Sequence, residues 1–204
     1  MDDADWHDKT TLDAISEDDL EQILRGQIET FKDRDKRQFP NFRIIGEKKI
    51  VDLNHDGTYS IVLWLNDAVV MYFGAAIIKE AHQYSLFYFY RDISLKDLIG
   101  DGRLEIVVTD PIIYKAGRFV GSNPMASVYW YDIFVLDRTL QKADSRFPAF
   151  YRKTLAEYKK VQENIRNFDF KGYAARKGIV GNQSQYLQIL STAILATEAI
   201  LKEK

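Results

Sequence analysis

Two short acidic stretches that align with each other constrain the fold of this chain more than any other feature. The first is Asp52-Leu53-Asn54-His55-Asp56-Gly57 and the second is Asp97-Leu98-Ile99-Gly100-Asp101-Gly102. Each is followed by an apolar, β-branched run, Ser60-Ile61-Val62-Leu63 in one copy and Glu105-Ile106-Val107-Val108 in the other. Because such runs favour strands, the pattern predicts a repeated strand–loop–strand unit.

The alternation of oxygen-bearing side chains in these loops suits a hard cation such as calcium. An EF-hand is excluded, because its twelfth loop position requires a carboxylate and here holds Leu63 or Val108. A plainer alternative is that both stretches are Asp-Gly hairpin turns, in which Asp52 and Asp97 bond to backbone amides.

The two stretches resemble the FG-GAP/VCBS repeat of integrin α-subunit propellers and of many exported bacterial proteins. In that family, calcium is bound by side chains at loop positions one, three, five and nine and by the carbonyl at position seven. The resemblance implies that the first loop binds calcium through Asp52, Asn54, Asp56, the Thr58 carbonyl and Ser60. It implies that the second loop uses Asp97, Asp101, the Arg103 carbonyl and Glu105. Since Ile99 replaces the third ligand, calcium is expected more in the first loop than in the second.

The rest of the chain predicts an α+β fold rather than a full propeller, which needs at least four blades. We expect a flexible tail over residues 1–15 and a single domain over 16–204. Helical spacing predicts helices at 16–33, 147–166 and 184–202, and strand patterns fill 42–136. The predicted architecture is an antiparallel meander sheet with two blade-like hairpins, packed by the N-terminal and C-terminal helices.

Composition and motifs exclude several functional classes. The net charge of −2 is spread along the chain and argues against a nucleic-acid surface, and the absence of cysteine excludes thiolate chemistry. No stretch reads as a transmembrane span. None of the three histidines has a ligand-like neighbour in sequence, so a catalytic or zinc role is not expected. The tyrosine-rich run 84–90 could bind sugar rings or a partner, but a buried sheet explains it better.

The start of the chain, Met1-Asp2-Asp3-Ala4-Asp5, is acidic and unlike a signal peptide. The protein is therefore either cytoplasmic or an exported protein whose signal has been removed. The family resemblance favours a periplasmic or extracellular location.

These observations support three functional hypotheses. The first is a calcium-stabilised, non-enzymatic binding module of an exported bacterial protein, with a protein or a glycan as partner. The second is a metal-dependent enzyme that uses the acidic loops, which requires an open coordination position over a pocket. The third is an interaction protein that docks through its C-terminal helix and whose loops are ordinary turns without metal.

Overall fold

The computed structural model describes residues 3–24, 42–67, 72–80, 83–89, 91–111, 128–167 and 183–203. Its contacts divide the chain into two compact units. We name these the N-terminal unit, Met1–Val108 with Ile133–Lys142, and the C-terminal unit, Thr109–Asp132 with Ala143–Lys204. Compact units need not fold separately, so the single domain over 16–204 stays a prediction.

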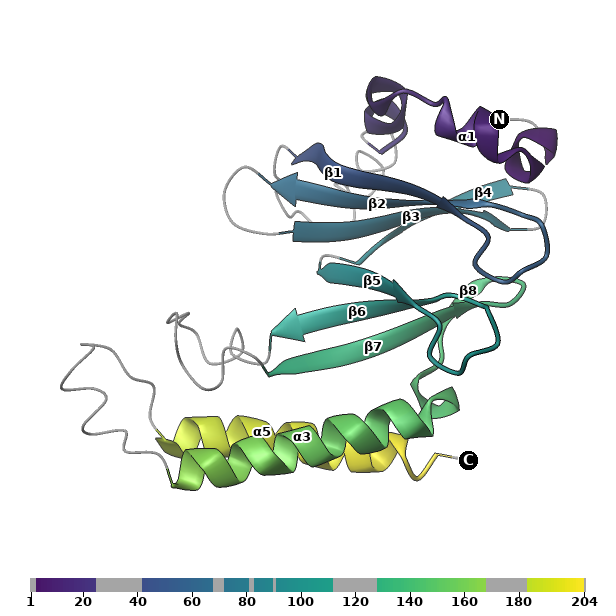
Figure 1. The fold of residues 1–204 in the computed structure, drawn as a ribbon. Helices are drawn as coiled ribbons and strands as arrows, with labels where there is room; N and C mark the ends of the chain where they lie inside the picture. Colours follow the sequence, from purple (N-terminus) through teal and green to yellow (C-terminus); the bar gives the residue numbers. More distant parts are fainter. Residues whose placement is uncertain are drawn as a thin grey trace. The chain divides into compact units, whose positions relative to one another are not determined.

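The strands form two four-stranded antiparallel sheets, each a meander in chain order (Figure 1). The first sheet contains β1 (Phe42–Val51), β2 (Ser60–Asp67), β3 (Tyr72–Glu80) and β4 (Gln83–Tyr88). The second contains β5 (Asp92–Lys96), β6 (Glu105–Pro111), β7 (Tyr129–Leu136) and β8 (Leu140–Lys142). The predicted α+β class is confirmed, and within the described residues no sheet closes into a barrel or propeller.

Alternate residues of β2 and β3 enter two different hydrophobic cores of the N-terminal unit. Ile61, Leu63 and Ile77 lie in the core shared with the N-terminal helices. Val62 and Ile78 lie in the second core, with side chains of β5, β6 and β8. The first sheet is therefore buried on both faces, which explains why its strands read as continuous apolar runs rather than as an alternating pattern.

The N-terminal segment is anchored, which differs from the predicted flexible tail. Residues 3–15 include the 3₁₀ helix η1 (Asp3–His7) and the helix α1 (Lys9–Asp13). The side chains of Trp6 and Leu12 are 1% and 0% exposed, because both enter the core under the first sheet. The Asp8 carboxylate accepts a hydrogen bond from the Thr10 amide at 2.9 Å and so caps α1.

A further helix follows α1, as the sequence predicts. Residues 17–24 are helical, and the Ser16 hydroxyl accepts a hydrogen bond from the Asp19 amide at 3.1 Å, so Ser16 caps the start of this helix. Leu20 and Leu24 are buried in the same core as Trp6. The rest of the predicted helix 16–33 lies outside the described residues.

The C-terminal unit is built on the helices α3 (Pro148–Arg166) and α5 (Gln183–Ile200), which confirms the two predicted C-terminal helices. Pro148 is the first residue of α3, where its missing N–H and fixed φ cost nothing. The Tyr151 hydroxyl donates to the Tyr131 carbonyl at 3.0 Å, and the Tyr158 hydroxyl donates to the Tyr129 carbonyl. These bonds fix α3 to the start of β7.

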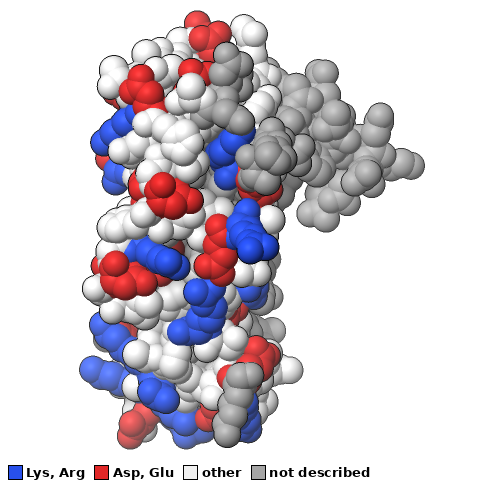
Figure 2. Space-filling model, turned by 90° about the vertical axis from the view of Figure 1, so that its right-hand side faces the viewer, with Lys and Arg blue, Asp and Glu red and all other residues white. Residues whose placement is uncertain are grey.

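The surface carries charges of both signs. Lysines and arginines are interspersed with aspartates and glutamates on the face shown in Figure 2. Among the described residues, no helix has both the length and the apolarity that crossing a bilayer requires.

Candidate metal centre

Each acidic stretch joins the first two strands of its own sheet. Asp52 directly follows β1 and Ser60 is the first residue of β2, while Asp97 directly follows β5 and Glu105 is the first residue of β6. We name residues 52–60 loop one and residues 97–105 loop two. The predicted strand–loop–strand repeat is therefore confirmed, and its two copies occupy equivalent positions in the two meanders.

Asp52 closes loop one by accepting two backbone hydrogen bonds. Its Oδ1 accepts from the Asp56 amide at 3.2 Å and its Oδ2 from the Gly57 amide at 2.8 Å. The turn requires left-handed backbone at His55 and Gly57, whose φ angles are 60° and 84°. These bonds are the ones that the plainer turn interpretation predicts, and they also hold the Asp52 carboxylate inside the loop.

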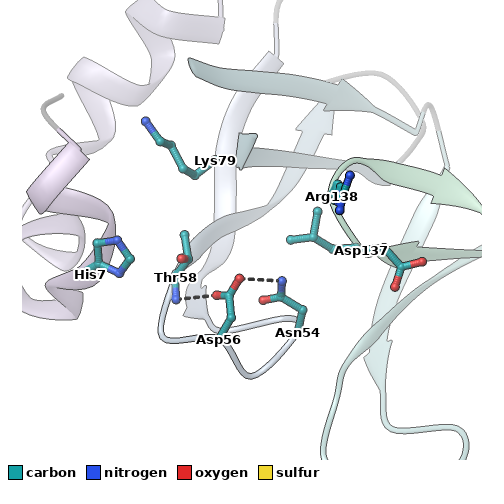
Figure 3. A pocket seen from close by; sticks show the side chains of 8 residues that line it. His7, Asn54, Asp56, Thr58, Lys79, Asp137 and Arg138 are labelled. Atoms are coloured by element: carbon teal, nitrogen blue, oxygen red, sulfur yellow. Dashed lines mark hydrogen bonds between the residues drawn. The ribbon is translucent and has the colours of Figure 1, made fainter. Parts of the chain in front are cut away.

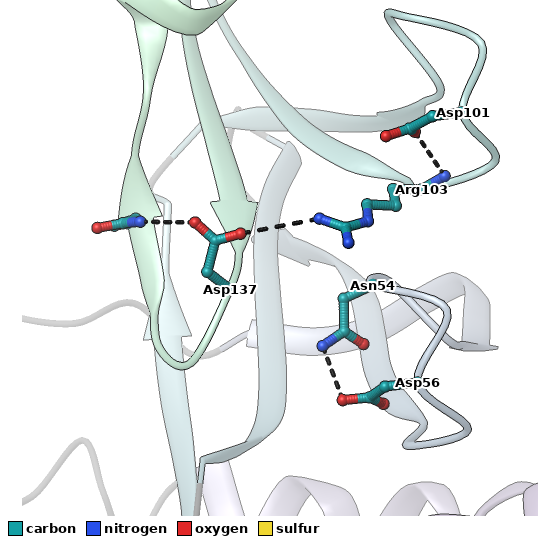
Figure 4. Close-up of polar contacts among 6 residues, drawn as sticks. Asn54, Asp56, Asp101, Arg103 and Asp137 are labelled. Atoms are coloured by element: carbon teal, nitrogen blue, oxygen red, sulfur yellow. Dashed lines mark hydrogen bonds and ion pairs between the residues drawn. The ribbon is translucent and has the colours of Figure 1, made fainter.

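Asp56 and Asn54 lie against each other inside loop one (Figures 3 and 4). The Asn54 amide nitrogen donates to Asp56 Oδ2 at 2.8 Å, and the Thr58 amide donates to Asp56 Oδ1 at 2.8 Å. Burial alone raises the pKa of Asp56, but these hydrogen bonds outweigh it, so the pKa lies below its ordinary value. The carboxylate is thus held in its charged form.

Loop one contains one buried side-chain oxygen, that of the Asn54 amide, for which the described part of the chain supplies no hydrogen-bond partner. Asn54 Oδ1 is buried and has no hydrogen-bond partner. A buried polar atom without a partner costs free energy, so it calls for an explanation. If the amide flips about its Cβ–Cγ bond, this oxygen exchanges position with the nitrogen and faces the Asp56 carboxylate, an arrangement that a cation between them would stabilise.

The remaining predicted ligand of loop one lies in the sheet. Ser60 is 1% exposed and pairs with Val51 at the start of β2. The Ser60 side chain is therefore buried at the point where loop one enters β2.

Loop two repeats the turn but not the ligand set. Asp97 accepts hydrogen bonds from the amides of Gly100 at 2.6 Å, Asp101 at 3.2 Å and Gly102 at 3.0 Å. Desolvation acts to raise the pKa of Asp97, but these amide bonds lower it below its usual range. Ile99, at the third position, is 62% exposed and points no oxygen into the loop.

Glu105 and Arg103, the other predicted residues of loop two, have structural partners. Glu105 is 3% exposed, and its Oε2 accepts a hydrogen bond from the Leu98 amide at 2.8 Å. Burial raises the pKa of Glu105, and the charges of Asp101 and Asp97 add to that effect. The Arg103 amide donates to Asp101 at 3.0 Å, and its guanidinium lies 4.0 Å from Asp137 (Figure 4).

The two loops lie in contact within the N-terminal unit. The Leu104 amide donates to the Leu53 carbonyl at 2.9 Å. The His55 ring covers Gly102 so closely that a Cβ built there would lie 2.6 Å from His55 Cε1. The aligned sequences predict two equivalent loops but carry no signal that the loops touch.

The N-terminal segment closes over loop one and was not expected to contribute to it. His7 Nδ1 donates to the Gly57 carbonyl at 3.0 Å, and the Tyr59 amide donates to the Trp6 carbonyl at 2.7 Å. The sequence separation of these contacts hides them from any analysis of local spacing. The single available signal is Trp6, a large apolar side chain in an otherwise acidic stretch.

A pocket of about 410 Å³ lies beside loop one in the N-terminal unit (Figure 3). It is lined by residues of η1, loop one, β3, the end of β7 and the turn that follows it: His7, Asn54, Asp56, Thr58, Lys79, Leu136, Asp137 and Arg138. Sequence analysis identified the three loop-one residues and missed the other five, which come from three separate segments.

The donor chemistry of loop one fits calcium better than a transition metal. Within the described ranges, no three carboxylate, imidazole or thiol side chains converge on one point. A metal in loop one would therefore depend on neutral oxygens, those of the Asn54 amide, the Thr58 carbonyl and the Ser60 hydroxyl, beside Asp52 and Asp56. An all-oxygen set of this kind suits a hard cation.

Comparison with known proteins adds no family assignment. No protein-family model, no curated protein and no solved structure matches this chain significantly.

Proposed function

We propose that this chain is a calcium-stabilised, non-enzymatic binding module of the FG-GAP/VCBS type, in which loop one binds the ion. The observation that carries the proposal is the buried and unpartnered Asn54 Oδ1, in a loop where hydrogen bonds hold the Asp56 carboxylate in its charged form and where the Asp52 carboxylate accepts two backbone amides. The four-stranded meanders support it further, because a propeller blade is a four-stranded sheet and each meander carries its loop after the first strand.

Calcium would be held by the side chains of Asp52, Asn54, Asp56 and Ser60 and by the Thr58 carbonyl. The ion supplies positive charge that cross-links these oxygens and offsets the repulsion between the two carboxylates. The chain itself holds Asp52 through the amides of Asp56 and Gly57, so that the loop is partly ordered before it binds metal. Loop two would bind calcium more weakly, because Ile99 supplies no oxygen and the Leu98 amide already occupies Glu105.

The proposed setting is the periplasm or the cell exterior, with a protein or a glycan as partner. Millimolar calcium in such compartments matches a loop that lacks the bidentate twelfth-position carboxylate, for which we expect a Kd on the order of 0.1–1 mM. The metal-dependent enzyme remains the alternative. It would need a second carboxylate over the pocket, and Asp137, the acidic residue of the opposite wall, is bonded to Gln141 and paired with Arg103.

Thermal unfolding with calcium and with chelator tests the proposal. A ligand at ten times its Kd stabilises the folded state by about 1.4 kcal/mol. For a chain of this length, that should raise the melting temperature by roughly 3–6 °C. Magnesium should act less, because it gives up its water shell reluctantly.

Matched aspartate variants of the two loops provide the control. Asp56→Ala should remove most of the difference between calcium and chelator, while Asp101→Ala, the equivalent change in loop two, should reduce it less. Asp56→Ala also removes hydrogen bonds that Asp56 makes without metal, and this lowers the melting temperature in calcium and in chelator alike. The difference between the two melting temperatures of each variant therefore reports calcium binding alone. Equal melting temperatures of the wild type in calcium and in chelator would refute the proposal and leave the loops as Asp-Gly turns.

A further inference from the structure

The pocket beside loop one has the size and the lining of a small polar ligand site. Its volume of about 410 Å³ falls within the range of roughly 300–1,000 Å³ that small-molecule sites occupy. Seven of its eight lining residues carry a polar or charged group, and Leu136 is the one that does not. A lining of this kind favours a ligand that is rich in hydroxyl or charged oxygen.

With calcium bound in loop one, the charges around the pocket would favour an anion, because the ion would offset the Asp56 carboxylate beside Lys79 and Arg138. Within the described part of the chain, no hydrogen bond or ion pair engages the Arg138 side chain, although it lines the pocket and is exposed. Its acidic neighbour Asp137 instead bonds to Gln141 at 2.9 Å and pairs with Arg103 (Figure 4). A free guanidinium presents a planar fork that matches a carboxylate.

The other walls of the pocket contribute a second cation and a fixed imidazole. Lys79 adds its positive charge from β3, with its amino group turned away from loop one in Figure 3. Because His7 Nδ1 donates to the Gly57 carbonyl, its Nε2 is the ring atom left for a ligand. His7 can therefore accept a hydrogen bond from a hydroxyl at this wall.

The metal-binding side of loop one faces the same pocket. Asn54, Asp56 and Thr58 belong both to the proposed ligand set and to the pocket lining. Calcium takes six to eight oxygens, and loop one offers about five, which leaves positions for oxygens that come from the pocket. A ligand could therefore bind the ion and Arg138 together.

We infer that this pocket binds an acidic sugar of the uronate class. Its carboxylate pairs with Arg138, and its ring hydroxyls reach His7, Thr58 and the open coordination positions of calcium in loop one. This inference rests on the proposed calcium site and extends it by naming the ligand. The lining favours a sugar acid, because seven of its eight residues carry a polar or charged group and no aromatic side chain other than the His7 imidazole belongs to it.

Titration calorimetry with galacturonate in excess calcium tests the inference, with galactose, acetate and inorganic phosphate as comparison probes. Galacturonate should bind more tightly than all three. Arg138→Gln should weaken galacturonate binding roughly 10- to 100-fold, as expected for the loss of a charge-assisted hydrogen bond. Arg152→Gln, a change of another exposed arginine on α3, is the matched control and should leave the affinity unchanged. Because every variant is titrated under the same conditions, any binding of calcium by free galacturonate affects all of the titrations equally.

The melting-temperature shift in calcium, measured on the same samples, separates the two proposals. If Arg138→Gln keeps the calcium shift and loses galacturonate, the inference is supported. If the shift is present but galacturonate fails to bind, binds no better than acetate or phosphate, or binds Arg138→Gln equally well, the inference is overturned and the calcium module stands. If no calcium shift occurs, the calcium module is overturned, and with it a ligand bridged by the ion.

Discussion

At the scale of single residues, the glycines of loop two offer a clean comparison. Gly100 and Gly102 both have left-handed backbone, with φ of 78° and 88°. A Cβ at Gly100 would meet open space, whereas one at Gly102 would lie 2.6 Å from the His55 ring. Gly100→Ala should lower the unfolding free energy by about 1–2 kcal/mol through backbone strain alone. Gly102→Ala should lower it further, as measured by urea denaturation.

The double variant His55→Ala/Gly102→Ala shows whether the ring causes the extra loss. Without the imidazole, the cost of Gly102→Ala should fall to that of Gly100→Ala. Equal losses for the two glycine variants in the wild-type background would mean that the His55 ring moves aside without cost. The contact between the loops would then be adaptable rather than fixed.

The sequence predicts much of the local structure at this scale because the signals are local. Asp52 and Asp97 end strands, and Gly57 and Gly102 take positive φ, as the Asp-Gly pattern indicates. His7 and Arg138 could not be found in the same way. They reach the pocket from segments far from loop one along the chain, and nothing in their own neighbourhoods points to it.

At the scale of secondary-structure elements, Gly74 sets how closely β3 approaches β5. A Cβ at Gly74 would lie 2.3 Å from Cγ2 of Ile93, a buried side chain that has little room to move. Gly74→Ala should therefore lower the unfolding free energy by about 1–3 kcal/mol through overpacking. In the Ile93→Ala background, the same substitution should cost less, because the space is then free. Urea denaturation of the four proteins measures this coupling, and additive losses would contradict the predicted clash.

The tyrosine hydroxyls that join α3 to β7 should make the protein less stable in alkaline solution. Burial raises the pKa values of Tyr151 and Tyr158 above that of a free tyrosine, and each hydroxyl donates to a carbonyl of β7. In the unfolded chain these groups ionise near pH 10. Their contribution to stability is therefore complete below about pH 10 and is lost as the pH rises further.

Tyr158→Phe isolates one of these two groups. At neutral pH the variant should lose about 1 kcal/mol, because the Tyr129 carbonyl loses its donor. Above about pH 10, its stability should fall less steeply than that of the wild type. Denaturant midpoints followed across this pH range give both quantities. An identical slope in the two proteins would show that Tyr158 is not held protonated by the fold.

The division of the strands into two sheets shows where prediction of elements from sequence ends. The β-branched runs predict β2 and β6 with their first residues, because strand propensity and the preceding glycine are both local. Which strands share a sheet depends on the two cores that Ile61 and Val62 enter from opposite faces of β2. A run that is apolar at every position does not reveal that it is buried on both faces.

At the scale of the whole molecule, both loops belong to the N-terminal unit, while α3 and α5 belong to the C-terminal unit. A ligand stabilises the segments that it orders and those that unfold together with them. The proposed calcium site should therefore act unevenly along the chain. Hydrogen exchange followed by mass spectrometry measures this distribution directly, because each peptide reports the opening of its own amides.

We expect calcium to slow exchange in peptides that cover loop one and residues 3–8, since Trp6 and His7 bond to that loop. Loop two should be protected to a smaller extent through the bond between Leu53 and Leu104. Peptides of α3 and α5 should change little, and they serve as the internal control. In Asp56→Ala, the calcium-dependent protection of loop one and of residues 3–8 should disappear together. Equal protection of both units would mean that calcium stabilises the chain without preference for loop one, and no protection anywhere would refute the site.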